Sequence, residues 1–157
     1  ESNEQDVGVL CPPRRLPKTI RVTHRFQDTF VIIASQTASL DLPPDKKRID
    51  EWLQAQNWLL IEESSNTGKQ LRSWIKRQGL RISPVMQLDN FDLIINLVSL
   101  GMGISLVPIR ALALYNRKKN VVRIPYHKRF SRQLIVVVRK HRHMQPHLEN
   151  FIENILF

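Results

Sequence analysis

The chain has 157 residues, 42% of them hydrophobic, and carries a formal net charge of +10 at pH 7. This composition excludes a largely disordered chain and is sufficient for one sizeable domain or for two small lobes that share strands. The basic residues are spread over turns and outer helix faces, which favours a solvated basic surface. A surface that binds nucleic acid is the alternative.

The sequence contains one cysteine, Cys11, so an intrachain disulfide is excluded, and no spacing of Cys and His residues indicates a zinc site. There is no run of 18 apolar residues, and the first six residues are polar and acidic. We therefore expect neither a transmembrane helix nor a signal peptide in this sequence. These features fit a protein of a reducing compartment that has no membrane partner.

The first part of the chain predicts three strands. Residues 6–10 form a short apolar run that ends at Cys11-Pro12-Pro13, which predicts a buried strand followed by a rigid loop. Residues 18–26 alternate, and Asp28 separates them from the apolar run 30–35, so two consecutive strands are predicted there. Because an inner strand needs neighbours on both sides, we expect further sequence upstream.

Helices then alternate with strands. A short helix around residues 49–53 precedes a strand at 58–62, and a helix over 69–77 precedes a strand at 85–88. Beyond the stretch 86–108, the sequence predicts a short helix at 111–115, strands at 121–124 and 134–138, and a last helix that begins near Pro146. This order predicts an α/β protein with mixed, mostly parallel sheets and helices on both faces.

Residues 86–108 are the most informative stretch. Apolar residues between Asn90 and Gly101 recur on one helical stripe, and Asp89 and Asn90 stand where an N-cap belongs. Gly101 supplies a helix stop before the apolar strand 104–107. A helix between two strands with such short connections is a βαβ unit.

Two helix starts are candidate ligand sites, because a doubly wound sheet binds ligands outside the carboxyl ends of its strands, where helix N-termini present unpaired N–H groups. The candidate residues are Ser64, Ser65, Asn66 and Thr67 before the first of these helices and Asn90 and Phe91 before the second. Hydroxyl and amide donors added to backbone N–H groups suit a carboxylate or a similar small anion. In the alternative, Ser65 or Asn66 only caps its helix, which accounts for one of these residues equally well.

No arrangement typical of catalysis is present. The glycines form no G-x-G-x-x-G motif after a strand, no phosphate-loop lysine motif occurs, and Ser105 lies inside a strand rather than at a nucleophile elbow. Glu62 and Glu63 are strand neighbours that point to opposite faces, so they would not act together on one substrate. We expect no enzymatic activity, no cofactor and no bound metal.

Four stretches carry a family resemblance: residues 6–10, 30–35 and 57–61 and, above all, Leu97-Val98-Ser99-Leu100-Gly101-Met102-Gly103-Ile104-Ser105-Leu106-Val107-Pro108. In this order and spacing they resemble the effector-binding domain of LysR-type bacterial transcription regulators, whose signature has the form LVxxGxGIxxLP. The resemblance covers nearly the whole chain. It implies a two-lobed fold of the type 2 periplasmic-binding-protein class, with a small effector held in the cleft between the lobes.

Carried onto this chain, lobe one comprises residues 1–25 and 125–157, and lobe two comprises residues 26–124. The positions that match the family's effector contacts include the Ser64 to Thr67 loop and the Asn90-Phe91 turn. Cys11 and Pro12 are further ligand-binding candidates. The winged helix-turn-helix DNA-binding domain and the first strand and helices of lobe one do not occur in this sequence, so the chain resembles a truncated effector domain.

The expected function is therefore that of an effector-sensing and dimerisation domain. It would bind a small anionic inducer, form a homodimer or homotetramer in the bacterial cytoplasm, and reach DNA only through a domain outside this chain. A stand-alone solute-binding protein of the same fold is the alternative, which an upstream secretion signal would favour. A third reading, a basic nucleic-acid-binding domain, predicts a strongly salt-dependent affinity for DNA.

Overall fold

The computed structural model describes residues 7–37, 42–43, 45, 48–140 and 146–156. The chain divides into two compact units. Unit 1 is formed by Glu1–Asp28 and Arg132–Phe157, and unit 2 by Thr29–Ser131. These limits lie close to the predicted lobe boundaries after residues 25 and 124, and the identification of the units with two ligand-binding lobes stays a prediction.

Unit 1 pairs β1 (Val7–Leu10) with β7 (Ser131–Arg139) in an antiparallel register. Helix α5 (Pro146–Leu156) packs on these strands through Ile152, which is buried in a small core that includes Val136. The last helix and the strand at 134–138 are thus confirmed.

A strand forms at Val7–Leu10 as predicted, but the prediction that it is buried is wrong. Strand β1 stands at the end of the order β1-β7-β2-β5, with one strand neighbour among the described residues, and Val9 is 43% exposed. Apolar content alone does not distinguish an inner strand from an edge strand that covers a small core on one face. Asp6 lies outside the described residues.

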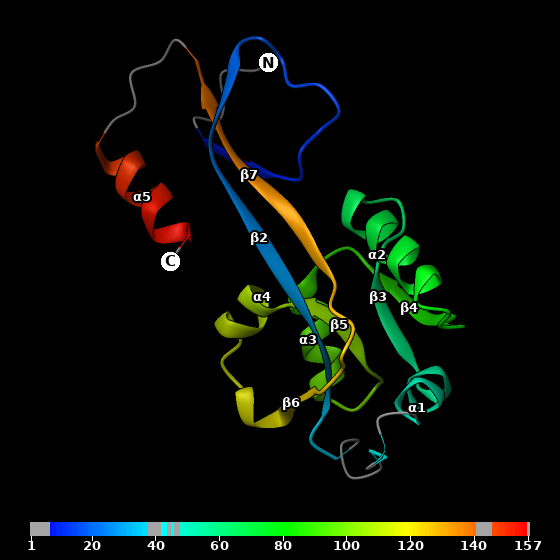
Figure 1. Cartoon of the computed structure of the whole chain (residues 1–157). Helices are drawn as coiled ribbons and strands as arrows, with labels where there is room; N and C mark the ends of the chain where they lie inside the picture. Colours follow the sequence, from blue (N-terminus) through cyan, green and yellow to red (C-terminus); the bar gives the residue numbers. More distant parts are fainter. Residues whose placement is uncertain (1–6, 38–41, 44, 46–47, 141–145, 157) are drawn as a thin grey trace. The chain divides into compact units, whose positions relative to one another are not determined.

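The two strands predicted on either side of Asp28 form one 16-residue strand, β2 (Ile20–Ser35), which lies beside β7 (Figure 1). Asp28 does not end the strand as expected, and it is only 2% exposed. Its Oδ2 accepts hydrogen bonds from Arg132 Nε at 3.0 Å and from Arg132 Nη2 at 2.9 Å. Because a partner on the neighbouring strand neutralises the carboxylate, the polar residue is tolerated inside the strand.

In unit 2, the second half of β2 pairs antiparallel with β5 (Ser105–Pro108) and with β6 (Val121–Ile124). Strand β3 (Trp58–Ile61) pairs in parallel with β4 (Pro84–Leu88), and a parallel bridge links β3 to Ile104. The prediction of mostly parallel sheets is not met by the described strands, because the registers of β1–β7, β2–β5 and β2–β6 are all antiparallel. Parallel pairing is confined to strands that are joined through helices.

The helices of unit 2 are α1 (Ile49–Ala55), α2 (Asn66–Arg77), α3 (Phe91–Ser99) and α4 (Ile109–Leu114), with a 3-10 turn at Lys118–Asn120. All four residues of β3 are buried, as are Ile94, Ile95 and Val98 on the inner face of α3. Elements β4, α3 and β5 follow in the predicted strand-helix-strand order, and Gly101, with φ of 80°, stands at the end of the helix.

Candidate functional site

The helices α2 and α3 both begin at the carboxyl ends of the parallel strands β3 and β4. Ile61, the last residue of β3, is paired with Leu88, the last residue of β4. The pairing continues one residue further, where Glu62 N donates to Leu88 O at 2.8 Å, and Glu63 N donates to the Gln87 side chain at 3.3 Å. The structure therefore brings the two predicted helix starts to the same end of one strand pair within unit 2.

Ser65 is the N-cap of α2. Its Oγ accepts a hydrogen bond from Gly68 N at 2.9 Å and donates one to Glu62 O at 2.7 Å. Helix α2 begins at Asn66, three residues before the start predicted at residue 69, because this cap already orders the first turn. Gly68 allows the close approach, since a Cβ at this position would overlap the Glu62 carbonyl.

The other polar residues of this loop differ in exposure. Ser64 and Asn66 are exposed, whereas Thr67 is 6% exposed and belongs to the core side of the helix. Ser64 Oγ donates to Glu62 Oε2 at 3.1 Å, and Asn66 Oδ1 accepts from Gln70 Nε2 at 2.6 Å. Of the four predicted loop residues, Ser64 and Asn66 are therefore the two that present polar side chains to solvent without acting as the cap.

Asn90 is the N-cap of α3, and its Oδ1 accepts from Leu93 N at 2.8 Å. Phe91 is half-buried, with its ring edge-on to that of Phe30 at 5.7 Å between centroids. Ser65 and Asn90 thus both cap their helices, and Phe91 packs against Phe30. The first-turn N–H groups of a helix, which have no intrahelical partner, remain the feature that the two helix starts share.

Cys11 and Pro12 lie in unit 1, directly after β1, and both are half-buried. Ser64 to Thr67, Asn90 and Phe91 all belong to unit 2. Arg72 is half-buried, and its Nε lies 3.8 Å from the Glu63 carboxylate. The sequence carries no signal for this contact, because only the three-dimensional course of α2 places a residue two turns into the helix beside the loop.

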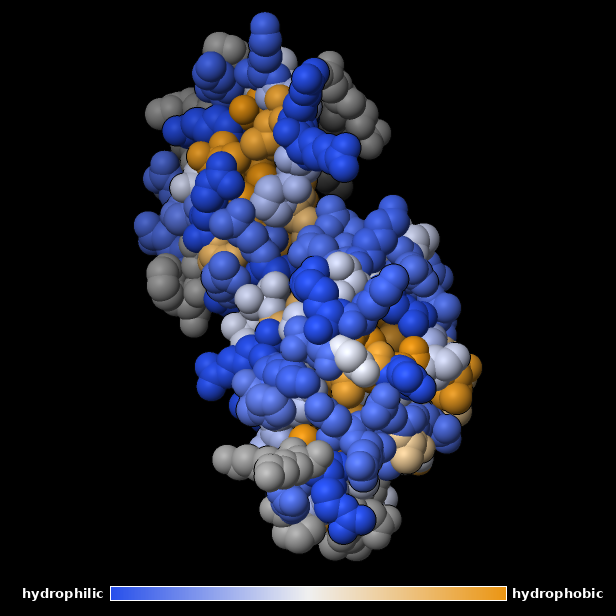
Figure 2. Space-filling model, turned by 45° about the vertical axis from the view of Figure 1, so that its right-hand side comes forward, coloured by the Kyte–Doolittle hydropathy of each residue, from blue (hydrophilic) through white to orange (hydrophobic). Residues whose placement is uncertain are grey.

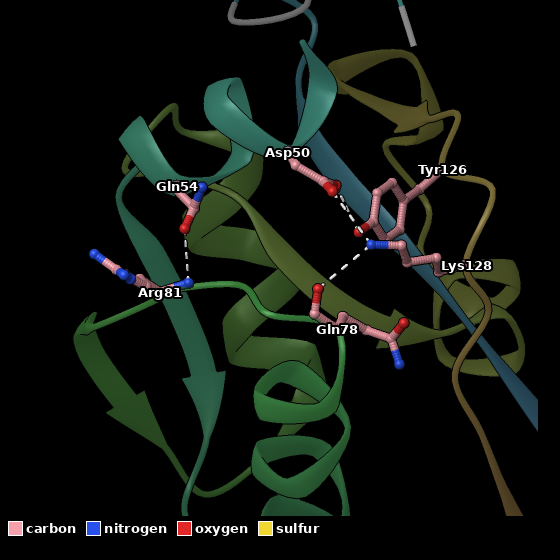
Figure 3. A network of polar contacts seen from close by, with 6 residues as sticks. All are labelled: Asp50, Gln54, Gln78, Arg81, Tyr126 and Lys128. Atoms are coloured by element: carbon pink, nitrogen blue, oxygen red, sulfur yellow. Dashed lines mark hydrogen bonds and ion pairs between the residues drawn. The ribbon is translucent and has the colours of Figure 1, made fainter. Parts of the chain in front are cut away.

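A polar network holds the segment between β6 and β7 against α1 and α2 (Figure 3). Tyr126 Oη donates to Asp50 Oδ1 at 2.7 Å, and Lys128 Nζ donates to Asp50 Oδ2 at 3.2 Å and to Gln78 O at 3.4 Å. Burial alone would raise the pKa of Asp50, but the hydrogen bonds from Tyr126 and Lys128 outweigh it and lower that pKa. Burial and the Asp50 carboxylate together raise the pKa of Tyr126.

In the part of the chain that the structure describes, no three His, Cys, Asp or Glu side chains form a group that could hold a metal ion. No described helix combines the length and the apolar character that crossing a membrane requires.

The sequence matches the family model of the LysR substrate binding domain over residues 1–156. A search of curated proteins gave no match. Among solved structures, the chain is similar to the CcmR regulatory domain of Synechocystis PCC6803 in complex with 2-PG, with 18% identity and a TM-score of 0.69. The similarity covers 98% of this chain and 73% of the CcmR chain. It is also similar to the effector binding domain of QuiR in complex with shikimate, with 17% identity and a TM-score of 0.62, covering 96% of this chain and 70% of that one.

A longer relative is HinK, a LysR family transcriptional regulator from Pseudomonas aeruginosa, with 15% identity and a TM-score of 0.67. This similarity covers 94% of the present chain but only 50% of the HinK chain. These similarities, together with the family match, confirm the predicted type 2 periplasmic-binding-protein-like fold.

Proposed function

Since the chain belongs to the family of LysR substrate-binding domains, we propose that it senses a small anionic effector and transmits its presence to a DNA-binding domain elsewhere on the full-length regulator. The domain acts by binding rather than by catalysis, and it does so in the bacterial cytoplasm, where the regulated DNA lies. Transmission requires that the effector have different affinities for two arrangements of the protein. The family match favours this reading over a stand-alone solute-binding protein.

The observation that carries the proposal is the pair of helix starts at the carboxyl ends of β3 and β4. Helix N-termini at this edge of a sheet attract negative charge, and the chain as a whole is basic. In the proposed site, Ser64 and Asn66 supply side-chain hydrogen bonds, while Ser65 and Asn90 hold the helix starts in place. The complexes of CcmR with 2-PG and of QuiR with shikimate support a small molecule as the ligand class.

The remaining proposed contacts in unit 2 are Thr67 and Phe91, and a ligand-binding role of Cys11 and Pro12 in unit 1 stays a prediction. Thr67 and Phe91 would shape the site rather than bind charge, because Thr67 is buried and Phe91 packs on Phe30. No metal ion or cofactor has a role in this proposal.

The test begins with a thermal-shift screen of the protein against small carboxylates and phosphate esters, shikimate among them. For a compound that stabilises the protein, the double substitution Ser64→Ala with Asn66→Ala should weaken binding about tenfold, because two hydrogen bonds to an anion are lost. Ser83→Ala, at an exposed serine of the same unit, is the control and should leave the affinity unchanged. Unchanged affinity in the double variant would reject the loop as the effector site.

Self-association as a homodimer or homotetramer is part of the proposal. Leu93, Leu100 and Met102 in and after α3 are 41%, 74% and 45% exposed, and Figure 2 shows hydrophobic areas between the hydrophilic residues of the face in view. Covering such side chains is the usual driving force for association. Leu100→Glu should shift the protein to monomer in sedimentation analysis. An unchanged sedimentation coefficient would place the interface elsewhere.

A further inference from the structure

One side of α2 borders an open hollow of about 550 Å³ within unit 2. Its lining contains three cationic side chains, Lys69 and Arg77 from α2 and Arg129 from the segment between β6 and β7, and no carboxylate. None of the three forms an ion pair with any residue that the structure describes. Arg72 on the same helix differs, since it lies beside Glu63. Three like charges therefore line one space without an acidic partner among the described residues.

Two packed aromatic side chains belong to the lining of this hollow. Trp74 and Phe130 are 7% and 4% exposed, and their ring centroids lie 5.9 Å apart. Trp74 Nε1 donates to the backbone carbonyl of Arg129 at 3.1 Å, which fixes the backbone that carries the third cation against α2. A ligand that meets side chains on fixed backbone loses less affinity to ordering.

The hollow also has neutral hydrogen-bonding groups. Ser73 and Gln70 belong to its lining, and Ser73 stands on α2 midway between Lys69 and Arg77, on the same face of the helix. Arg77 Nη1 donates to Ser73 Oγ at 2.8 Å, which restrains the guanidinium before any ligand arrives. At a rise of about 1.5 Å per residue, the backbone positions of Lys69 and Arg77 lie about 12 Å apart along the helix. This spacing suits a ligand with more than one anionic group.

We propose that this hollow is a second ligand site, which takes a small polyanion with two or more phosphate or carboxylate groups. Like charges that line one hollow without a counter-charge repel one another, and a bound polyanion relieves this repulsion while it accepts hydrogen bonds from the cations. A neutral molecule would not neutralise the cations, and a cationic one would add to their repulsion. None of Ser64 to Thr67, Asn90 or Phe91 lines the hollow, so its lining differs from the proposed effector contacts. The two sites adjoin through Gln70, which lines the hollow and donates to Asn66 Oδ1 at 2.6 Å.

The test is a calorimetric titration of the protein with two probes, inorganic pyrophosphate and citrate. Preference for pyrophosphate identifies a phosphate ligand and preference for citrate a carboxylate ligand. Binding of either probe that is weakened by substitutions at Lys69, Arg77 and Arg129 supports the site. Lys69→Gln should weaken binding about fivefold, because one charge-assisted contact is lost at a solvent-open site. The triple variant Lys69→Gln, Arg77→Gln and Arg129→Gln should lose measurable binding.

Lys76→Gln is the matched control, because Lys76 is an exposed lysine of the same helix that does not line the hollow. It removes the same charge and should change the affinity less than twofold. The single variant Ser64→Ala, which leaves the bond between Gln70 and Asn66 in place, should bind the probes as the unsubstituted protein does, so failure of the effector site and failure of the hollow are distinguishable. Circular dichroism checks that each variant is folded.

Three results would overturn the proposal. One is the absence of binding by either probe at low ionic strength. Another is equal weakening by Lys69→Gln and Lys76→Gln, which would indicate the diffuse field of a basic protein instead of a site. The third is tight, salt-dependent binding of double-stranded DNA that Lys69→Gln abolishes while neither probe binds, which would make the face a nucleic-acid contact.

Discussion

Replacing Arg132 by methionine should strongly destabilise unit 1. The guanidinium lies 2.9 Å from the carboxylate of Asp28, whose side chain is 3% exposed. At this distance the attraction is ~6 kcal/mol for an effective dielectric constant of 20, and the desolvation of both charges offsets much of it. Removal of one partner alone leaves the other charge buried and uncompensated, which costs about 3–5 kcal/mol. Asp28 Oδ1 has no hydrogen-bond partner within the described chain, so no other donor takes over.

Replacing both partners should change the stability much less than replacing Arg132 alone. In Asp28→Val with Arg132→Met, no charge is left behind, and a β-branched residue suits the middle of a strand. Exchanging a buried ion pair for apolar side chains is often neutral or stabilising, so the double variant should lie within about 1.5 kcal/mol of the original protein. Arg25→Met, at an exposed arginine on the same strand, is the control and should change stability by about 0.5 kcal/mol or less.

Urea unfolding followed by far-UV circular dichroism measures these differences from the shift of the midpoint. Tryptophan fluorescence is a useful second probe, because Trp52, Trp58 and Trp74 all belong to unit 2. Coincident shifts of both signals would mean that the units unfold together, and a shift of the dichroism alone would mean that unit 1 unfolds separately. Two results would contradict a costly uncompensated charge at Asp28. One is a cost of less than about 1 kcal/mol for Arg132→Met, and the other is a double variant as unstable as Arg132→Met.

Three further substitutions test local contacts in unit 2. Ser65→Ala should cost about 1 kcal/mol in urea unfolding through loss of the α2 cap, and a cost near zero would show that the cap is not used. Gly68→Ala should cost about 1–3 kcal/mol because its Cβ would overlap the Glu62 carbonyl, and wild-type stability would contradict this close approach. Because the pKa of Asp50 is lowered in the folded protein, its contribution to stability is present above about pH 4 and is lost as the pH falls through the folded value. Asp50→Asn should therefore flatten the loss of stability below about pH 4, as measured by thermal unfolding across that range; parallel curves would reject the role of the Tyr126 and Lys128 contacts.

Local sequence patterns predicted the helices and their starting points with few errors, whereas the ligand contacts at these helix starts stay a prediction. Ser65 and Asn90 stand at helix starts because short polar side chains there accept N–H groups that the helix itself leaves unpaired, and this needs only neighbours in sequence. The strand-helix-strand order of residues 86–108 likewise follows from periodicity and glycine positions.

Contacts between distant residues explain the failures. Asp28 resembles a strand breaker until Arg132, 104 residues later, is placed beside it. The antiparallel pairing of β2 with β5 and β6 depends on how strands far apart in the chain return to each other, which periodicity does not encode. The same holds for the basic hollow, because Arg129 lies near Lys69 and Arg77 through contacts such as the hydrogen bond from Trp74, 55 residues away in the chain, to the Arg129 carbonyl.

Unit 2 is one continuous segment inserted into unit 1, and this fixes the order in which the chain can be completed on the ribosome. Phe30 N donates to Phe130 O at 2.9 Å, so the two ends of the insert are tied to each other. Synthesis proceeds at about 5–20 residues per second, and unit 2 is whole once Ser131 has been added. Unit 1 needs residues 132–157, which supply the partner of Asp28 and the strand that pairs with β1. A nascent chain halted after Ser131 would therefore contain all residues of unit 2. Its Asp28 carboxylate, which is buried in the finished protein, would still lack the Arg132 partner.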